Sequence, residues 1–349
     1  YLAVVEKTVG HIIREEINIA GSGSAFECWY GGKERQTLPT YHTMETCVTF
    51  TWMQLCNRLL QLTGNSLYAD YIEKAVYNAL MASLKADASQ IAKYSPLEGW
   101  RHEGEEQCGM HINCCNANGP RAFALIPGFA YQAQDDCIRI NFYTPSDAYI
   151  WLKGKREIHI EQETNYPVED TIRINIDPKR STTFALALRI PAWSQIATVS
   201  VNGEPQSGVL QGAYYTINRK WEKGDQVCIR LDLRAHLVEQ NQAQAIVRGP
   251  IVLARDSRFN DGFIDETSQI VSKEGYVELT PVEAPAFAWM AFTAPMILGT
   301  DLEGNRTPKQ VHLCDFASAG NTWDKTQRYR VWLPKTLNVM HTPYKPYNQ

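Results

Sequence analysis

Three short segments of the chain carry side chains that could bind a metal or attack a substrate. Glu27 stands in the first segment, FECW, and Glu45 and Cys47 stand in the second, ETC. Cys114 and Cys115 follow each other directly in the third. Thiolates, imidazoles and carboxylates are the groups that a tetrahedral zinc site accepts. A possible set of four ligands is Glu45, Cys47, Cys114 and Cys115.

The spacing within these segments leaves two interpretations open. It is not the spacing of a zinc finger, and positions i and i+2 do not share one face of a helix. Glu45 and Cys47 could therefore converge only at the start of a helix or from an extended chain. In the other interpretation the thiols are simply packed, and the positive end of a helix dipole stabilises the glutamate.

The remaining cysteines do not indicate a disulfide framework. The chain has nine cysteines, an odd number, and it is too long to need the disulfides that small secreted domains use. A bridge between the adjacent Cys114 and Cys115 would require a distorted peptide bond. We expect the isolated cysteines to be small buried hydrophobic residues, namely Cys56, Cys137, Cys228 and Cys314.

Composition places the chain among ordinary globular proteins. Its 349 residues suggest two or three domains. A net charge of −4 argues against a surface that coats nucleic acid, and no apolar run reaches the roughly 18 to 20 residues of a membrane helix. We therefore expect neither nucleic acid nor a membrane as a partner. The aromatic content of 11% suits both sugar stacking and the cores of β-sandwiches.

The first third of the chain has the apolar period of helices. An apolar stripe beginning at Leu2 predicts one helix, and further stripes predict helices over residues 45–62, 66–84 and 117–131. The stretch 85–113 is long and irregular, and loops of that length are usually functional.

After residue 134 the pattern changes to short alternating segments separated by turn signals, which predicts β-sandwich structure. A further β-rich block begins at 242–254. We expect irregular chain after it, because of Pro281, Pro285 and Pro295, until a short strand at 329–333.

These patterns predict an α+β multidomain protein with domains at 1–133, 134–240 and 241–349. About four amphipathic helices cannot close an α/α architecture, because their apolar faces need partners. We therefore expect the helical part to be incomplete, with an N-terminal half of the same protein as its missing partner.

Residues 27–121 resemble the catalytic region of glycoside hydrolase family 127, the β-L-arabinofuranosidase family. The resemblance rests on PTYHTMETCVTFTWMQLCNRLLQLTGNSLYADYIEKAVYNAL, KYSPLEGW and CGMHINCCNANGPRAFALIP, in this order. It implies the second part of an (α/α)6 toroid followed by two β-sandwich domains. It also implies a retaining, exo-acting glycoside hydrolase that removes a terminal furanose, such as β-L-arabinofuranose, from an oligosaccharide or plant glycan.

The resemblance also implies roles for individual residues. The four candidate ligands match the family's zinc ligands, so Zn²⁺ is the expected cofactor. Cys114 matches the nucleophile, Glu27 matches the general acid/base, and Tyr94 matches a tyrosine at the sugar site. Glu27 stands in SAFECW, where well-known members read more like GEAF, and Glu34 is the nearest substitute.

The implied chemistry makes physical demands on these residues. Coordination to zinc deprotonates a thiol, which makes its sulfur a strong nucleophile. Glu27 would protonate the departing oxygen and then deprotonate the water that completes hydrolysis. Its pKa must be high enough for the first step, which burial beside Phe26 and Trp29 would favour. The same two rings could equally be part of the core. His42 and His111 are candidate polar contacts to the substrate.

Three other classes of function stay open. A polysaccharide lyase or an epimerase on the same fold would use a tyrosine or histidine base and would not need the cysteine pair. A non-catalytic carbohydrate-binding protein would have no use for the ligand set. A redox role is the weakest alternative, because the sequence lacks a CxxC motif.

Overall fold

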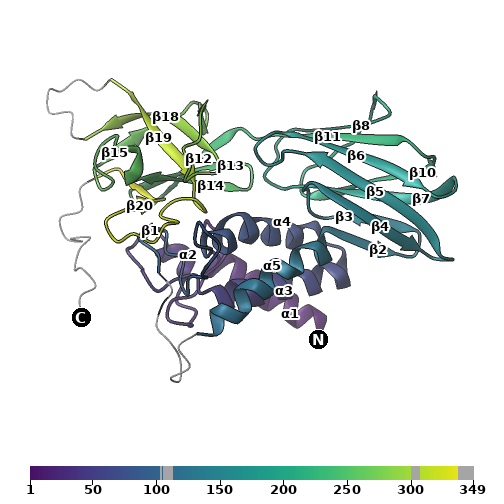
Figure 1. The fold of residues 1–349 in the computed structure, drawn as a ribbon, viewed down its shortest axis with the longest axis horizontal. Coiled ribbons are helices and arrows are strands. Elements are labelled where there is room, and N and C mark those ends of the chain that lie inside the picture. Colours follow the sequence, from purple (N-terminus) through teal and green to yellow (C-terminus); the bar gives the residue numbers. More distant parts are fainter. Residues whose placement is uncertain (103, 105–112, 300–306, 337–349) are drawn as a thin grey trace. The chain divides into compact units, whose positions relative to one another are not determined.

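The computed structural model describes residues 1–102, 104, 113–299 and 307–336 (Figure 1). None of the helices in these residues combines the length and apolar character needed to cross a membrane. The helices are α1 (Leu2–Glu15), α2 (Gly32–Arg35), α3 (Thr46–Thr63), α4 (Ser66–Ala75) and α5 (Cys114–Ala130), and a π-helical segment at Val76–Leu80 continues α4.

The change from helices to strands falls where the hydrophobic period predicts it. α5 ends at Ala130 and β2 begins at Tyr131, close to the expected boundary at residue 133. In the described part of the chain the short strand β1 (Glu98–Gly99) precedes that boundary, and the sequence pattern did not predict it. The chain is therefore a mixed α+β protein with sheet-rich regions.

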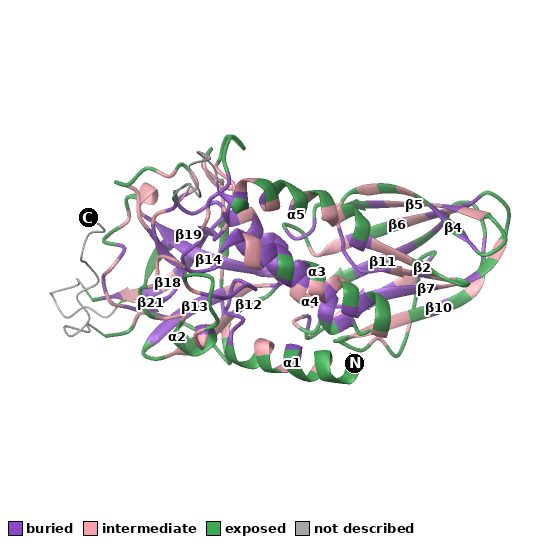
Figure 2. Ribbon diagram, turned by 90° about the horizontal axis from the view of Figure 1, so that it is seen from below, coloured by how far each residue is buried: buried purple, intermediate pink, exposed green. Residues whose placement is uncertain are grey.

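Apolar spacing explains why the long helices form. In α3 the buried apolar side chains recur every three or four residues: Phe50, Met53, Cys56, Leu59 and Leu60. This is the stripe of an amphipathic helix that packs on one face. α1 differs, because Val9 is its only buried residue and most of its surface is exposed, as Figure 2 shows.

The chain divides into two compact units. Unit 1 comprises Tyr1–Trp52, Lys74–Pro120 and Arg234–Gln349, and unit 2 comprises Met53–Glu73 and Arg121–Leu233. Each unit combines helical segments with strands, whereas the domains expected from the sequence separate the two.

Unit 2 contains two sheets. The strand order is β4-β5-β6-β11-β8-β9 in the larger sheet and β10-β7-β3-β2 in the smaller one. The larger sheet comprises β4 (Ser146–Leu152), β5 (Arg156–Thr164), β6 (Thr171–Pro178), β8 (Ala197–Val201), β9 (Glu204–Pro205) and β11 (Asp225–Leu231). The smaller sheet comprises β2 (Tyr131–Gln134), β3 (Cys137–Ile140), β7 (Thr182–Ile190) and β10 (Ala213–Trp221). Every second side chain of β5 and β6 is buried, as in sheets with one face on a core.

A buried ion-pair network joins α4 to β7 within unit 2. The guanidinium of Arg189 on β7 lies 2.5 Å from a carboxylate oxygen of Asp70 and 2.5 Å from one of Glu73. The Arg189 and Glu73 side chains are fully buried. Tyr166 and Trp193 each donate a further hydrogen bond to Glu73. Because buried charges are tolerated only when paired and hydrogen-bonded, this network fixes the helix on the sheet.

The strands of unit 1 form one sheet with the order β15-β18-β19-β14-β13-β12-β16 and four shorter additions. The main strands are β12 (Ala235–Gln240), β13 (Ala243–Arg248), β14 (Ile251–Asp256), β15 (Ser268–Ile270), β16 (Tyr276–Val277), β18 (Ala291–Leu298) and β19 (Lys309–Asp315). The additions are β1, β17 (Thr280–Val282), β20 (Tyr329–Arg330) and β21 (Leu333–Pro334).

The expectation of irregular chain after residue 254 was wrong. The region contains β18 and β19, which pair along six register positions, as well as shorter strands. Pro295 lies inside β18, where it lacks an N–H but its carbonyl still accepts a hydrogen bond from the backbone of Val271. Pro281 lies in β17, which among the described strands pairs only with β18, so a missing donor on its other side costs little.

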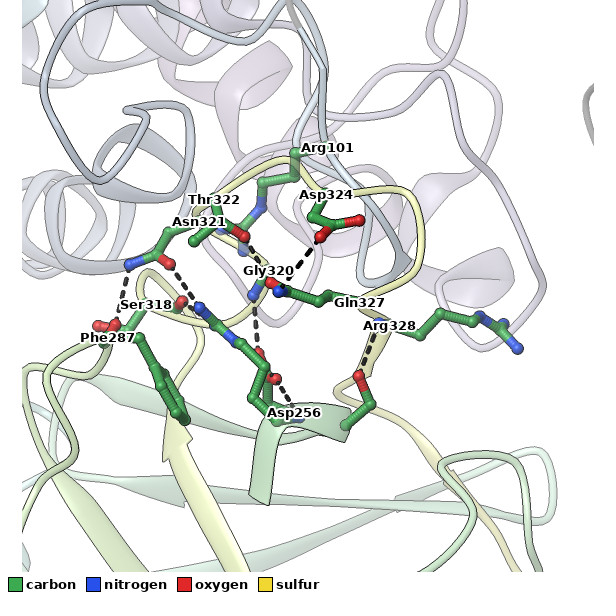
Figure 3. Close-up of polar contacts among 12 residues, drawn as sticks. Arg101, Asp256, Phe287, Ser318, Gly320, Asn321, Thr322, Asp324, Gln327 and Arg328 are labelled. Atoms are coloured by element: carbon green, nitrogen blue, oxygen red, sulfur yellow. Dashed lines mark hydrogen bonds and ion pairs between the residues drawn. The ribbon is translucent and has the colours of Figure 1, made fainter. Parts of the chain in front are cut away.

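This sheet anchors the chain that leads toward the cysteine pair. β1 pairs with β20, and Arg101 donates to the backbone oxygens of Phe316 and Ala317 at 2.6 and 3.0 Å. Figure 3 shows Arg101 beside the loop that follows β19. Asp256 holds the same loop by accepting from the backbone of Gly320 at 2.9 Å (Figure 3).

The core of unit 1 joins the helical region to this sheet. Met44 and Leu97 belong to one buried cluster with Val252, Phe316 and Tyr329. Met44 is completely buried and directly precedes Glu45, so the sheet fixes the start of α3.

Candidate metal and catalytic site

Glu45 and Cys47 lie at the N-terminus of α3. The Glu45 carbonyl accepts the first helical hydrogen bond, from the backbone of Thr49 at 3.0 Å. Thr46 fixes this helix start, because its backbone N–H donates to the Lys93 carbonyl at 2.9 Å and its hydroxyl donates to the Ala92 carbonyl at 2.7 Å. A helix start is one of the two geometries in which residues two apart in sequence could converge.

Cys114 and Cys115 are the first two residues of α5, so the helix begins three residues before the predicted start at 117. Asn113 caps it, because its side-chain oxygen accepts from the backbone of Cys115 at 3.0 Å. The side chain of Asn116 reaches back to the backbone N–H of Asn113 at 2.9 Å. This reciprocal pattern is that of a capping box, with asparagine in both positions.

The two helix starts bring the four candidate ligands together. The Cys47 sulfur lies 3.0 Å from the Cys114 sulfur and 3.4 Å from the Cys115 sulfur. A carboxylate oxygen of Glu45 lies 3.5 Å from Cys114 and 3.7 Å from Cys115. All four ligand atoms lie within 4.8 Å of one another. A tetrahedron with zinc–sulfur bonds of 2.3 Å separates its ligand atoms by about 3.8 Å, which falls within this range.

The accessibility of the thiols differs within the cluster. Cys114 is exposed, Cys47 is half-buried and Cys115 is fully buried. Glu45 is also buried. One thiol of the three is therefore open to a molecule that approaches from solvent.

The electrostatics of the cluster favour a cation. Burial, followed by the charge of Cys47, raises the pKa of Glu45 to about 7. Burial and the hydrogen bond with Cys47 raise the pKa of Cys114 to about 12, and the hydrogen bond with Cys47 raises that of Cys115 further. Several hydrogen bonds, of which the one with Cys115 has the largest effect, lower the pKa of Cys47 to about 5. One anion at Cys47 thus suppresses ionisation of its neighbours, and a divalent cation would relieve this repulsion. The donor set therefore fits zinc.

Glu27 lies in a tight turn next to this cluster. The backbones of Ala25 and Cys28 exchange two hydrogen bonds of 2.9 Å, and the two residues between them, Phe26 and Glu27, have φ values of 47° and 65°. Turns of this kind favour asparagine and glycine, so Phe26 and Glu27 hold a strained backbone. Strain of this kind concentrates at functional sites.

Aromatic rings do not bury Glu27 in the structure. Its side chain is 53% exposed, and Phe26 and Trp29 are exposed as well. The carboxylate is therefore open to solvent, and the two rings do not enclose it. Its charged partner is Lys93, whose ammonium lies 3.5 Å from the Glu27 carboxylate.

Rings surround the same turn. The imidazole of His42 stacks on Phe26 with centroids 4.4 Å apart and meets the ring of Tyr94 edge-on at 5.1 Å. The Lys93 ammonium lies 5.3 Å from the centre of the Tyr94 ring. His42, Tyr94 and Glu27 thus share one neighbourhood.

Of the two remaining sequence candidates, one cannot be placed and the other does not join this group. His111 lies outside the described residues. Glu34 lies exposed on α2, where its carbonyl accepts from the side chains of Gln240 and Asn241. Glu27 is the glutamate that lies beside Tyr94 and Lys93.

Sequence reasoning missed two residues of the site. Asn118 donates a hydrogen bond of 3.1 Å from its amide to the Cys47 sulfur, and its position four residues after Cys114 on one helix could have revealed it. The Lys93 side chain pairs with Glu27. Its backbone carbonyl accepts hydrogen bonds from the N–H of Thr46, at the start of α3, and from the Cys115 thiol at 3.8 Å. Nothing in its local sequence distinguishes it from a surface lysine.

Comparison with known families identifies the chain. Residues 1–128 match the profile of the β-L-arabinofuranosidase GH127 catalytic domain, and residues 137–233 match that of the GH127 middle domain. The two matches together cover more than half of the chain. The chain belongs to glycoside hydrolase family 127. These GH127 matches confirm the resemblance that the ETC and CC segments indicate.

Individual GH127 relatives agree with this assignment. The chain is 25% identical over 244 residues to a non-reducing end β-L-arabinofuranosidase of Bifidobacterium longum subsp. longum, a match that covers 62% of this chain and 36% of that protein. Among solved structures, it superposes on the GH127 β-arabinofuranosidase BT3674 with a TM-score of 0.81 and 24% identity, over 96% of this chain and 56% of that one.

A second solved structure is Ara127N, a GH127 β-L-arabinofuranosidase from Geobacillus stearothermophilus T6. Its TM-score is 0.76 at 23% identity, over 93% of this chain and 55% of that one. The chain therefore spans about a third to just over half the length of these GH127 relatives.

Proposed function

We propose that this chain carries the acid/base, nucleophile and metal ligands of a retaining, exo-acting glycoside hydrolase that releases a terminal furanose such as β-L-arabinofuranose. The observation that carries the proposal is the convergence of Glu45 and three cysteines, with Cys114 as the exposed thiol. A cluster that served only packing would have no need of an exposed thiol beside a buried glutamate.

Glu45, Cys47, Cys114 and Cys115 would hold Zn²⁺. When bound there, it would keep the thiols deprotonated at neutral pH. Cys115, fully buried, and Cys47, which accepts from Asn118, fit permanent ligands. Cys114 fits the nucleophile, because a substrate can reach it.

The proposed reaction assigns one role to each of two side chains. The Cys114 sulfur attacks the anomeric carbon of the terminal sugar, and the bond to the leaving oxygen breaks as Glu27 gives that oxygen a proton. Glu27 next takes a proton from a water molecule whose oxygen attacks the same carbon, and the carbon–sulfur bond breaks. Two inversions at one carbon retain its configuration.

The remaining groups of the site suit sugar binding. Lys93 lies close enough to Glu27 to hold its carboxylate in place, and Tyr94 and His42 offer polar groups on aromatic rings. The restricted exposure of Tyr94 fits a residue that lines a pocket more than one on an open surface.

The architecture we infer is part of an (α/α)6 toroid followed by two β-sandwich domains, at 1–133, 134–240 and 241–349. It is supported by the superposition on GH127 structures. The substrate class, an oligosaccharide or plant glycan with terminal furanose residues, is inferred from the names of the relatives. A lyase or epimerase that uses a tyrosine or histidine base would make no use of the cysteine pair.

The test is turnover of an aryl β-L-arabinofuranoside by the whole protein and its Cys114→Ser variant. We expect the substitution to lower the rate by at least roughly a thousandfold, because a serine hydroxyl is a far weaker nucleophile than a metal-held thiolate. A variant that kept most of the activity would favour the lyase or epimerase chemistry. Cys228→Ser, a half-buried cysteine on β11 in unit 2, is the matched control.

A further inference from the structure

The outer face of the larger sheet in unit 2 carries an aromatic edge. β4 is the edge strand of this sheet. Along it, Ile150 and Leu152 are buried, whereas Asp147, Tyr149 and Trp151 alternate with them and are exposed. The sheet therefore has its core on one face and two large aromatic rings on the other.

This placement is unusual for an exposed strand. Tyr149 is 57% exposed and Trp151 is 60% exposed. Edge strands usually carry charged residues, because flat apolar edges invite aggregation. Residues two apart on one face of a strand stand about 6.5 to 7 Å apart, so the two rings form a short aromatic strip.

One ring of the strip is held in a fixed orientation. Tyr149 pairs across the strands with His159 of β5, and their rings stack with centroids 4.7 Å apart and planes inclined by 23°. His159 is fixed in turn by Asp147, whose carboxylate lies 3.0 Å from its Nε2 atom. A ring that is already oriented loses little conformational freedom when a ligand stacks on it.

A row of polar side chains crosses the sheet next to the rings. Its members are directly opposite each other on consecutive strands and so share this face: Asp147, Glu161, Asn175 and Gln226. Asn175 donates to Glu161 at 3.2 Å and accepts from Gln226 at 2.9 Å. Adjacent strands lie about 4.8 Å apart, so the row offers carboxylate and amide groups at regular intervals over four strands.

We propose that this face, defined by Tyr149, Trp151 and the row from Asp147 to Gln226, is a binding site for a neutral, hydroxyl-rich glycan chain. Aromatic rings stack on the apolar C–H faces of sugars, while carboxylates and amides accept and donate hydrogen bonds to their hydroxyls. The face belongs to unit 2, whereas the residues of the cysteine cluster belong to unit 1.

The charges and the area of this face favour a neutral glycan over other occupants. The same face carries five carboxylates, of Asp147, Glu157, Glu161, Glu163 and Asp177, against the two guanidinium groups of Arg173 and Arg230. This net negative charge would repel a polyuronate. A second copy of the chain would need about 800 Å² of buried surface per partner, whereas two rings supply at most a few hundred. The rings also point off the face, so a peptide strand added at the β4 edge would not cover them.

The test measures binding of the full chain to debranched arabinan, with polygalacturonate as the anionic control, by affinity electrophoresis and calorimetry. We expect binding to arabinan and none to polygalacturonate. Tyr149→Ala and Trp151→Ala should each weaken binding about five- to tenfold, since both remove a stacking surface and leave the core untouched. Phe263→Ala, which removes a 76% exposed ring elsewhere in the chain, should leave binding unchanged.

The same variants separate this inference from the proposed catalytic function. Trp151→Ala should hydrolyse a small aryl arabinofuranoside at the wild-type rate, because none of the residues assigned to the catalytic site belongs to unit 2. Arabinan binding that needs the rings would support the glycan site even in a protein that hydrolyses nothing. Equal arabinan binding by wild type and the Tyr149→Ala/Trp151→Ala double variant would overturn the inference. A failure of the wild type to bind arabinan would also overturn it. So would a wild-type dimer that the double variant cannot form, because the rings would then belong to an interface between two copies of the chain.

Discussion

The sulfur atoms of Cys47 and Cys114 lie 3.0 Å apart, although the two residues belong to the starts of two different helices. Two thiols that share a site this small with Glu45 cannot both ionise unless a cation compensates them. The shared position of the helix starts, and not the sequence spacing, therefore creates the candidate zinc site.

Removal of one buried ligand should release the metal. Wild type should hold about one zinc per chain, and Cys115→Ser should hold much less. Elemental analysis of both purified proteins measures this directly. Equal zinc in the two proteins would mean that Cys115 is not a ligand.

The zinc affinity should also depend on pH. The pKa of Glu45 is raised to about 7 in the metal-free protein, and thiols must lose their protons to bind. Protons therefore compete with zinc, and the affinity should fall as the pH drops from about 8 to about 6. Competition with a chelator at a series of pH values measures this trend. A flat profile would contradict it.

Asn118 should act as a positioning residue for Cys47. Replacing it with alanine removes the hydrogen bond of 3.1 Å to the Cys47 sulfur and should weaken zinc binding about 10- to 100-fold. In cobalt-substituted protein the thiolate-to-metal absorption band should shift, which a general loss of stability would not cause. Asn260→Ala, an exposed asparagine on a loop of unit 1, is the control. Unchanged affinity and an unchanged band in Asn118→Ala would refute the role.

Glu27→Gln should separate natural from activated substrates. The amide cannot protonate the leaving oxygen, so glycan substrates should slow by about 10² to 10⁴. Aryl glycosides with acidic leaving groups need little protonation and should slow much less. Glu34→Gln should change neither rate. Equal slowing of both substrates by Glu27→Gln would argue against its role as the acid, and a strong effect of Glu34→Gln would transfer that role.

Arg189→Leu should destabilise unit 2 strongly. The substitution leaves the buried carboxylates of Asp70 and Glu73 without their cation, a loss that typically costs about 3 to 5 kcal/mol. Arg173→Leu makes the same chemical change at an exposed position on β6 and should cost little. Urea unfolding monitored by circular dichroism compares the two, and similar midpoints would show that the network contributes little.

Local sequence predicted the parts of this protein that depend on local rules. The apolar stripe from Phe50 to Leu60 predicted α3, because a helix that buries one face has an apolar residue at every third or fourth position. The start of α5 was placed three residues late, because the cap formed by Asn113 and Asn116 contains no residue of the usual serine–glutamate pattern. β18 was missed because Pro295 argues against a strand unless its partners are known.

The candidate site was also predictable only in part. The cysteines and Glu45 could be named from their chemistry and from the family resemblance. The exposure of Glu27 could not, since it depends on positive φ angles at Phe26 and Glu27 that residue types of this kind rarely adopt. Lys93 also escaped notice, because its pairing with Glu27 exists only in three dimensions.

The most direct test of the account is to locate the sugar in a trapped covalent intermediate. The whole protein would be treated with an alkylating arabinofuranose analogue, digested and mapped by mass spectrometry. The account predicts one sugar on the peptide that contains Cys114, with the sulfur of Cys114 modified and that of Cys115 free. A sugar attached to a carboxylate, at Glu27 or Glu45, would contradict it.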